Sequence, residues 1–147
     1  HRDLHSFPTR RSSDLDRKPT VRIGLVQWQM RPYASVDDLF EQVEFFVDSV
    51  SDYKSDFILF PEYFNAPLMA RFNDLGEAQS IRKMAQYTEE IRDRFRELAI
   101  SYNINIITGS MPYLKDDSLY NVGFLCRRDG SVDMYEKIHR LHLIKYI

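Results

Sequence analysis

Apolar side chains along this chain gather in short continuous runs, a pattern typical of buried strands in a sheet. The clearest run covers 57–60, four residues of aromatic and branched type that end at Pro61. Pro61 cannot donate to a ladder, so it should stop this strand. The runs at 21–28 and 104–108 predict two further buried strands, the second ended by Gly109.

Two later apolar segments, 119–127 and 131–138, flank the pair Asp129-Gly130. An Asp-Gly pair between strand-like segments predicts a hairpin, because glycine readily adopts the positive φ that a tight turn needs. The last two strands should therefore be antiparallel neighbours.

Helical periodicity fills the segments between the early strands. Ser35 with Asp38 three residues later resembles a capping box with Asp in place of Glu. A short helix is predicted over 76–86, and a longer one from Thr88 onward. The first helix should bury one face, made of Val36, Leu39, Phe40, Val43, Phe46, Val47 and Val50. The third should bury Ile91, Phe95, Leu98, Ala99 and Tyr102.

The segment 65–73, which contains Pro67, is expected to be a loop. Loops at this position in α/β enzymes carry substrate contacts. The alternative is plain packing of its apolar side chains and of Phe64 just before it, and we favour packing.

Strand, helix and strand in succession form a βαβ unit, so the expected fold class is α/β. Glu62 follows the strand at 57–60 and Pro61, which places one carboxylate at the carboxyl end of a buried strand. Ligands of open α/β sheets bind at that edge. Glu62 is thus a candidate catalytic acid or base, against the alternative of a solvated acid at a strand end.

Lys137 is the second candidate. Alternation in the last strand points Tyr135, Lys137 and His139 to one face and Glu136 and Ile138 to the other. A lysine that points inward needs a carboxylate partner, and Glu62 is the obvious one. Such a pair can accept a proton from a nucleophile and stabilise an oxyanion. From spacing alone, a structural ion pair is favoured over a catalytic one.

Composition narrows the classes of partner. The chain has 147 residues, enough for one domain, with 20 basic and 22 acidic side chains and a net charge of −2. Without a basic stripe, nucleic acid is not an expected partner. No apolar run approaches the roughly 18 residues of a membrane span, so we expect a cytoplasmic protein without membrane contact.

Cys126 is the one cysteine of the sequence. An internal disulfide and a cysteine-rich zinc site are excluded on this count. Because Cys126 ends an apolar strand, we interpret it as a packed structural thiol and not as a nucleophile.

The two ends of the chain do not share the pattern of the middle. Residues 1–15 resemble a translated sequencing adapter, so we expect a non-native leader there; the alternative is a disordered basic leader. Residues 140–147 follow His139 without closing a further element. We expect a gene fragment that ends in a frame slip at this point.

Five short motifs, in order and at similar spacing, resemble the N-terminal half of the nitrilase superfamily of carbon–nitrogen hydrolases. They are Val21-Arg22-Ile23-Gly24-Leu25-Val26-Gln27, Phe60-Pro61-Glu62, Ile107-Thr108-Gly109-Ser110, Leu119-Tyr120-Asn121 and Tyr135-Glu136-Lys137-Ile138-His139. Within the superfamily, the chain is most similar to hydrolase modules that follow an N-acetyltransferase-like domain in bacterial proteins. Residues 16–19 would then be the tail of a linker, and 20–147 the N-terminal part of the hydrolase domain.

The resemblance implies an α-β-β-α sandwich, truncated here at the C-terminus, and a Glu-Lys-Cys catalytic set. Glu62 would be the general base and Lys137 the stabiliser of the oxyanion. The cysteine would lie on a strand well after Lys137, and Cys126 does not match that motif. The resemblance therefore implies a parent hydrolase for small amides, nitriles or carbamoyl compounds that uses no metal or organic cofactor and is homo-oligomeric when complete. It also implies that the present chain is an inactive fragment with exposed apolar sheet surface.

Two other classes of function stay open. A non-catalytic binding module could keep the same fold and use the cleft at Glu62 only to bind. A nucleotide-binding domain is disfavoured, because Gln27-Trp28-Gln29-Met30 follows the first strand where a glycine-rich phosphate loop would stand.

Overall fold

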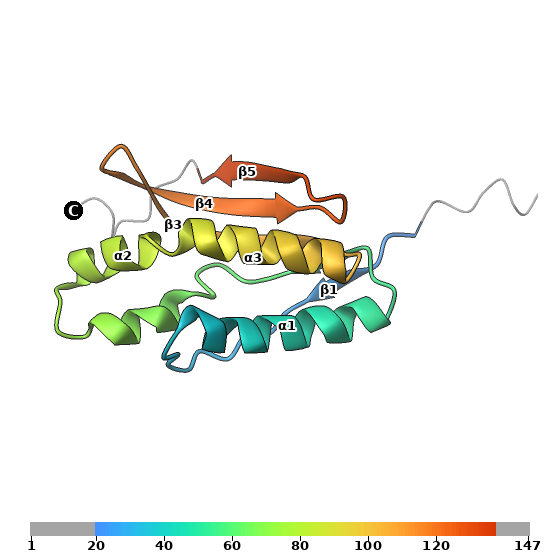
Figure 1. The fold of residues 1–147 in the computed structure, drawn as a ribbon, viewed down its shortest axis with the longest axis horizontal. Helices are drawn as coiled ribbons and strands as arrows, with labels where there is room; N and C mark the ends of the chain where they lie inside the picture. The colour runs from blue at the N-terminus through green and yellow to red at the C-terminus, as the bar shows by residue number, and fades with distance from the viewer. Residues whose placement is uncertain (1–19, 138–147) are drawn as a thin grey trace, which may run out of the picture.

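The computed structural model describes residues 20–137. The expectations for 1–15, 16–19 and 140–147, and for the side chains of Ile138 and His139, lie outside the described residues. Within them the chain forms a mixed α/β fold, which confirms the expected class (Figure 1). The elements are β1 (Ile23–Leu25), α1 (Val36–Asp52), β2 (Phe57–Leu59), the 3-10 helix η2 (Ala66–Phe72), α2 (Glu77–Ala85), α3 (Thr88–Ser101), β3 (Asn105–Lys115), β4 (Ser118–Cys126) and β5 (Val132–Glu136).

The five strands make one sheet in the order β1-β2-β3-β4-β5. β1, β2 and β3 run parallel, while β4 and β5 are antiparallel to their neighbours. The predicted βαβ unit and the Asp129-Gly130 hairpin are both confirmed. A second tight turn, which the apolar pattern did not reveal, joins β3 to β4 through Asp116 and Asp117, both at positive φ. Asp tolerates that conformation in two-residue hairpin turns.

Helix α1 begins as its sequence predicts. Ser35 has an extended backbone, and its hydroxyl accepts a hydrogen bond from Asp38 N at 3.1 Å. The Asp38 carboxylate reaches back to the N–H of Ala34 at 3.1 Å, one residue before the cap. This arrangement satisfies two backbone donors at the helix start, as a capping box does.

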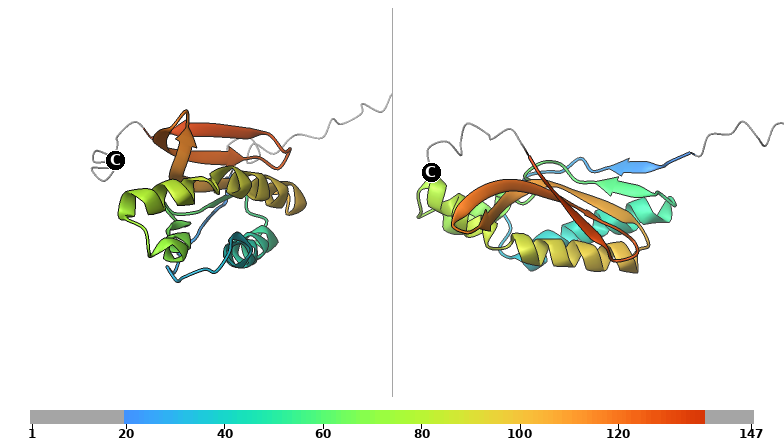
Figure 2. Two further views of the ribbon diagram at one scale, coloured as in Figure 1. Left: turned by 60° about the vertical axis from the view of Figure 1, so that its left-hand side comes forward. Right: turned by 90° about the horizontal axis from the view of Figure 1, so that it is seen from above.

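Helices α1 and α3 cover one face of the sheet (Figure 2). The predicted apolar faces of both helices are buried or partly buried there. At the centre of this layer the Phe95 ring lies 5.1 Å from the Phe60 ring and 5.2 Å from the Phe40 ring, centroid to centroid. Edge-to-face packing of this kind stabilises a core beyond its buried area.

The opposite face of the sheet is open at β1. Gly24 faces Val50 of α1, so its neighbours Ile23 and Leu25 point the other way. Their side chains are 57% and 73% exposed. The described residues therefore form a sheet that carries helices on one side only.

Two expectations were wrong. Segment 65–73 is not an irregular loop, because Ala66–Phe72 forms a 3-10 helix with Pro67 in its first turn, where the missing N–H costs nothing. Phe64 and Leu68 are fully buried, so packing explains them. Gly109 does not end its strand either: β3 continues to Lys115 past a bulge between Ile107 and Ser110.

Candidate active site

Glu62 lies just past the carboxyl end of β2, where its sequence position predicts it. The chain turns sharply there, since Tyr63 has a φ of +54°. Tyr63 N donates to Ser110 O at 2.8 Å, which ties this turn to β3. A residue held at positive φ by neighbouring structure is a feature that clusters at functional sites.

Lys137 follows β5 and meets Glu62 across the sheet. Its backbone N donates to Asn121 O at 2.8 Å, which extends the pairing of β5 with β4 by one step. Its Nζ donates to Glu62 Oε1 at 2.6 Å. The side chains are 36% and 43% exposed, respectively, so the pair lies at the surface of the described residues and not in the core.

Two residues not selected as site residues complete the group. Ser110 Oγ donates to Glu62 Oε1 at 3.2 Å, and Asn121 Nδ2 donates to the same oxygen at 3.4 Å. Both side chains are nearly buried. Ser110 and Asn121 each belong to one of the motifs that resemble the family, so the sequence did carry a signal for them. It did not indicate that their side chains point toward Glu62.

The register of the sheet explains why these groups meet. Ser110 is paired with Gly123 on β4, and Gly123 with Tyr135 on β5. Residues directly opposite in adjacent strands point to the same face, and Lys137 shares that face with Tyr135 two positions earlier. A side chain on Gly123 would overlap the Tyr135 ring, so the glycine lets this ring lie across β4.

The electrostatics of the site keep Glu62 ionised. The hydrogen bond from Lys137 Nζ holds the pKa of Glu62 below its usual value, against the opposing effect of burial. The charge of Lys137 and the bonds from Ser110 and Asn121 act in the same direction as that hydrogen bond. A carboxylate that is charged at neutral pH can accept a proton.

Two tyrosines feel the charge of Glu62. Burial, and then the negative charge of Glu62, raises the pKa of both Tyr63 and Tyr135. Their phenols, which are neutral at neutral pH and can donate hydrogen bonds, therefore ionise only at a higher pH than an ordinary tyrosine.

Cys126 lies on the other face of the sheet. It is five positions after Asn121 on β4, an odd number, so the two side chains point in opposite directions. Its sulfur lies 3.8 Å from Arg92 O in α3. The side chain is fully buried, which confirms the interpretation as a packed structural residue. This burial raises the pKa of the thiol to about 12.

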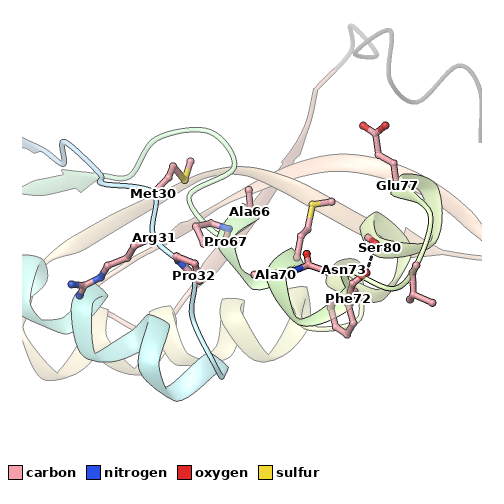
Figure 3. A pocket seen from close by; sticks show the side chains of 12 residues that line it. Met30, Arg31, Pro32, Ala66, Pro67, Ala70, Phe72, Asn73, Glu77 and Ser80 are labelled. Atoms are coloured by element: carbon pink, nitrogen blue, oxygen red, sulfur yellow. Dashed lines mark hydrogen bonds between the residues drawn. The ribbon is translucent and has the colours of Figure 1, made fainter.

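A groove of about 670 Å³ runs beside the segment that follows Glu62 (Figure 3). Met30–Pro32, which come after β1, form one wall, and η2 forms the other. Met69 and Phe72, from the segment expected to be a loop, line it. The lining is mostly apolar, with Arg31 and Glu77 as its charged members.

The part of the chain that the structure describes, residues 20–137, holds no group of three or more His, Cys, Asp or Glu side chains placed to bind a metal ion. None of its helices is long and apolar enough to cross a bilayer.

Comparison with known proteins gives a consistent picture. Residues 22–146 match the carbon–nitrogen hydrolase family. The chain is 37% identical over 119 residues to the probable hydrolase YhcX of Bacillus subtilis (strain 168). That match covers 81% of this chain and 23% of the relative, so the chain spans about a quarter of the relative's length.

Solved structures share the fold at low sequence identity. A carbon–nitrogen hydrolase from Helicobacter pylori G27 superimposes with a TM-score of 0.67 at 18% identity, over 84% of this chain and 41% of that chain. The NitFhit protein of C. elegans gives 0.61 at 18% identity, over 82% and 28%. A variant of the amidase from Nesterenkonia sp. AN1, in complex with butyramide, gives 0.59 at 19% identity, over 82% and 44%. With the match over residues 22–146, this chain belongs to the carbon–nitrogen hydrolase family.

Proposed function

We propose that this chain is the N-terminal part of a hydrolase that cleaves non-peptide carbon–nitrogen bonds in small amides, nitriles or carbamoyl compounds. The observation that carries the proposal is the 2.6 Å contact between Lys137 Nζ and Glu62 Oε1, two residues 75 positions apart that meet on one face of the sheet. A carboxylate and an ammonium group that the fold brings together from distant parts of the sequence fit acyl-transfer chemistry at a carbonyl or nitrile carbon.

In this mechanism Glu62 is the general base and Lys137 stabilises the oxyanion. The carboxylate takes the proton of a cysteine thiol, and the sulfur bonds to the substrate carbon. For an amide or a carbamoyl compound, the Lys137 ammonium stabilises the negative charge that develops on the carbonyl oxygen. For a nitrile it stabilises the charge on the nitrogen, and water must add to the resulting thioimidate before ammonia can leave. The carbon–nitrogen bond then breaks, ammonia or an amine leaves with the proton, and a thioester remains. Water, or another amine, attacks the thioester and releases the thiol.

The nucleophile of the proposed set comes from chain beyond residue 147. Cys126 is excluded as the nucleophile, because it packs against α3 on the opposite face from Glu62. A neighbouring structure supports a thiol in this chemistry: one form of the Nesterenkonia sp. AN1 amidase carries the acetamide moiety of fluoroacetamide bound covalently to its active-site cysteine. The chain as it stands is accordingly proposed to be inactive.

The remaining parts of the proposal follow from the same assignment. All the chemistry is assigned to side chains, with no metal or organic cofactor. The complete protein is proposed to be a cytoplasmic homo-oligomer whose hydrolase domain follows an acetyltransferase-like domain, with a small-molecule substrate and no nucleic acid or membrane partner.

The first experiment is to sequence the source DNA through the codon for Leu15 and well past that for His139. An open frame that continues to a cysteine on a later strand would support the hydrolase. The extended protein should release ammonia from a panel of short-chain amides. Glu62→Gln and Lys137→Ala should each abolish that activity with the fold intact, whereas Glu89→Gln, which removes a carboxylate on α3, should not. Near-normal rates in either site variant would refute the assigned roles.

The alternative is a non-catalytic binding module on the same fold. The observation that favours it is the position of Cys126, the one cysteine in the sequence, away from Glu62. A natural frame that ends at Ile147, or continues without a cysteine, would exclude catalysis and leave this alternative.

A further inference from the structure

Every hydrogen bond that the described residues make to the Glu62 carboxylate ends on one atom, Oε1. Lys137 Nζ, Ser110 Oγ and Asn121 Nδ2 donate to it at 2.6, 3.2 and 3.4 Å. These donors come from three places in the sheet: Lys137 just after β5, Ser110 on β3 and Asn121 on β4. A carboxylate oxygen has about two lone pairs in its plane, so three donors fill its capacity.

A local irregularity of β3 brings Ser110 to this face. Ile107 opposes Leu125, and Ser110 opposes Gly123, so three steps on β3 match two steps on β4. One extra residue in a strand reverses the alternation beyond it. In a regular strand Ser110 would point toward the helices; with the bulge it points at Glu62.

Gly109 makes the bulge compatible with the turn at Glu62. Its φ is +68°, and a side chain there would overlap the carbonyl oxygen of Pro61, the residue before Glu62. Only glycine fits both the backbone angle and the close approach. The bulge and the Glu62 turn are therefore packed against each other.

Asn121 is held in place at a cost. Its Nδ2 faces Glu62, while its Oδ1 is buried without a partner among the described residues. The amide cannot gain by flipping, because Oδ1 would then face a carboxylate. A buried acceptor without a partner destabilises the folded state, because it loses its hydrogen bonds to water and gains none in return. Residues retained at such a cost are candidates for a role other than stability.

We infer that Ser110 and Asn121 are positioning residues that hold Glu62 by Oε1 and leave Oε2 as the atom that receives the proton. The inference rests on the proposed role of Glu62 as general base. With Oε1 occupied, protonation takes place on Oε2, and the carboxylate cannot rotate to exchange the two oxygens without breaking three hydrogen bonds. Lys137 uses one of its N–H groups on Oε1, which leaves two for a developing oxyanion.

The test is a carbon-13 NMR titration of the Glu62 carboxyl group in the full chain. Ser110→Ala and Asn121→Leu should each shift the pKa of Glu62 upward, because each removes a donor to the charged form. Ser110→Thr, which keeps the hydroxyl, should restore the original titration. Ser80→Ala is the matched control, since Ser80 is equally buried but donates to Phe72 O and Gly76 O. An unchanged titration in both site variants would overturn the inference.

Stability provides a readout that separates positioning from a structural role. Asn121→Leu removes a buried acceptor without a partner, so its free energy of unfolding should be unchanged or higher while the titration shifts. A large loss of stability in this variant would assign Asn121 a structural role and overturn its part of the inference. If the leucine variant does not fold, Asn121→Ser, which is too short to reach Glu62, takes its place in the same titration.

The two proposals can fail separately. In the extended enzyme, loss of either donor should lower kcat with little change in KM and move the acidic limb of the pH profile to higher pH. If Glu62→Gln keeps its activity, the proposed function fails, whatever the titration shows. If Glu62→Gln is inactive but neither donor variant moves the titration or the pH profile, Glu62 is the base and the positioning inference fails.

Discussion

At the scale of single residues, the contact between Glu62 and Lys137 contributes little to stability. Both side chains are more than a third exposed, and water screens a pair at that depth. Exposed ion pairs typically contribute 0–1 kcal/mol. What the pair does set is the charge and the orientation of the Glu62 carboxylate.

The charge of Glu62 makes stability depend on pH. Because the folded protein holds the pKa of Glu62 below its usual value of 4.5, the ionised form favours folding above that pH. This contribution is lost as the pH falls from about 4.5 through the folded pKa. Urea unfolding between pH 7 and pH 3 should therefore show a shallower decline for Glu62→Gln than for the wild type. Glu41→Gln, on the exposed side of α1, is the control, and identical declines for the wild type and Glu62→Gln would contradict the prediction.

At the scale of elements, α1 depends on its cap. Ser35→Ala removes the side-chain acceptor for Asp38 N and should lower the free energy of unfolding by about 1 kcal/mol. The measurement is urea unfolding followed by circular dichroism. Ser49→Ala is the matched control, since this serine lies inside the helix and donates back to Phe45 O. Equal stability of the two variants would show that the cap contributes nothing.

The β3 bulge depends on Gly109. An alanine there takes a left-handed backbone at a cost of roughly 1–2 kcal/mol and also overlaps the Pro61 carbonyl oxygen. We expect Gly109→Ala to destabilise the chain by at least that amount and to disturb the Glu62 turn, visible as shifted Glu62 and Tyr63 resonances. Gly76→Ala is the control, because nothing lies near its missing side chain. Stability close to that of the wild type would contradict the packing described here.

The sequence predicts elements well where the signal is local. The cap at Ser35, the apolar face of α1 and the Asp129-Gly130 hairpin follow from nearby residues alone. The strand end predicted at Gly109 was wrong, because glycine weakens a strand only locally. Pairing with β4 continues on both sides of Gly109 and extends β3 beyond it. The same non-local pairing decides where Ser110 and Asn121 point, so their contact with Glu62 could not be predicted. The pairing of Glu62 with Lys137 could be predicted. The end of the strand at 57–60 placed Glu62 at the edge of the sheet, and the alternation in the last strand placed Lys137 on an inward face.

At the scale of the whole molecule, the described residues leave one face of the sheet without helices. Ile23 and Leu25 are exposed on β1, which is also an edge strand (Figure 2). Edge strands with exposed apolar side chains promote association between chains. The site formed by Glu62 and Lys137 lies on this same uncovered side.

Self-association of the isolated chain should therefore depend on this face. In sedimentation velocity over a range of concentrations, the wild type should form oligomers or aggregates, and Leu25→Lys should reduce them. Phe45→Lys is a matched control, because Phe45 is similarly exposed at 67% but lies on α1, across the sheet. Equal suppression by both variants, or a monomeric wild type, would contradict the prediction. Neither substitution should change stability by more than about 0.5 kcal/mol.

The layout of the sheet has a consequence for the order of folding. Two short hairpins join β3 to β4 and β4 to β5. In contrast, β1 and β2 pair only after the chain has crossed over through α1. The hydrogen bond from Arg22 N to Asp56 Oδ2, for example, joins residues 34 positions apart. Pairings that close short loops form ahead of those that close long ones. The contact of Glu62 with Lys137 spans 75 positions and joins the two halves. Its formation therefore follows the pairing of β5 with β4, and a nascent chain acquires this site only after β5 has docked.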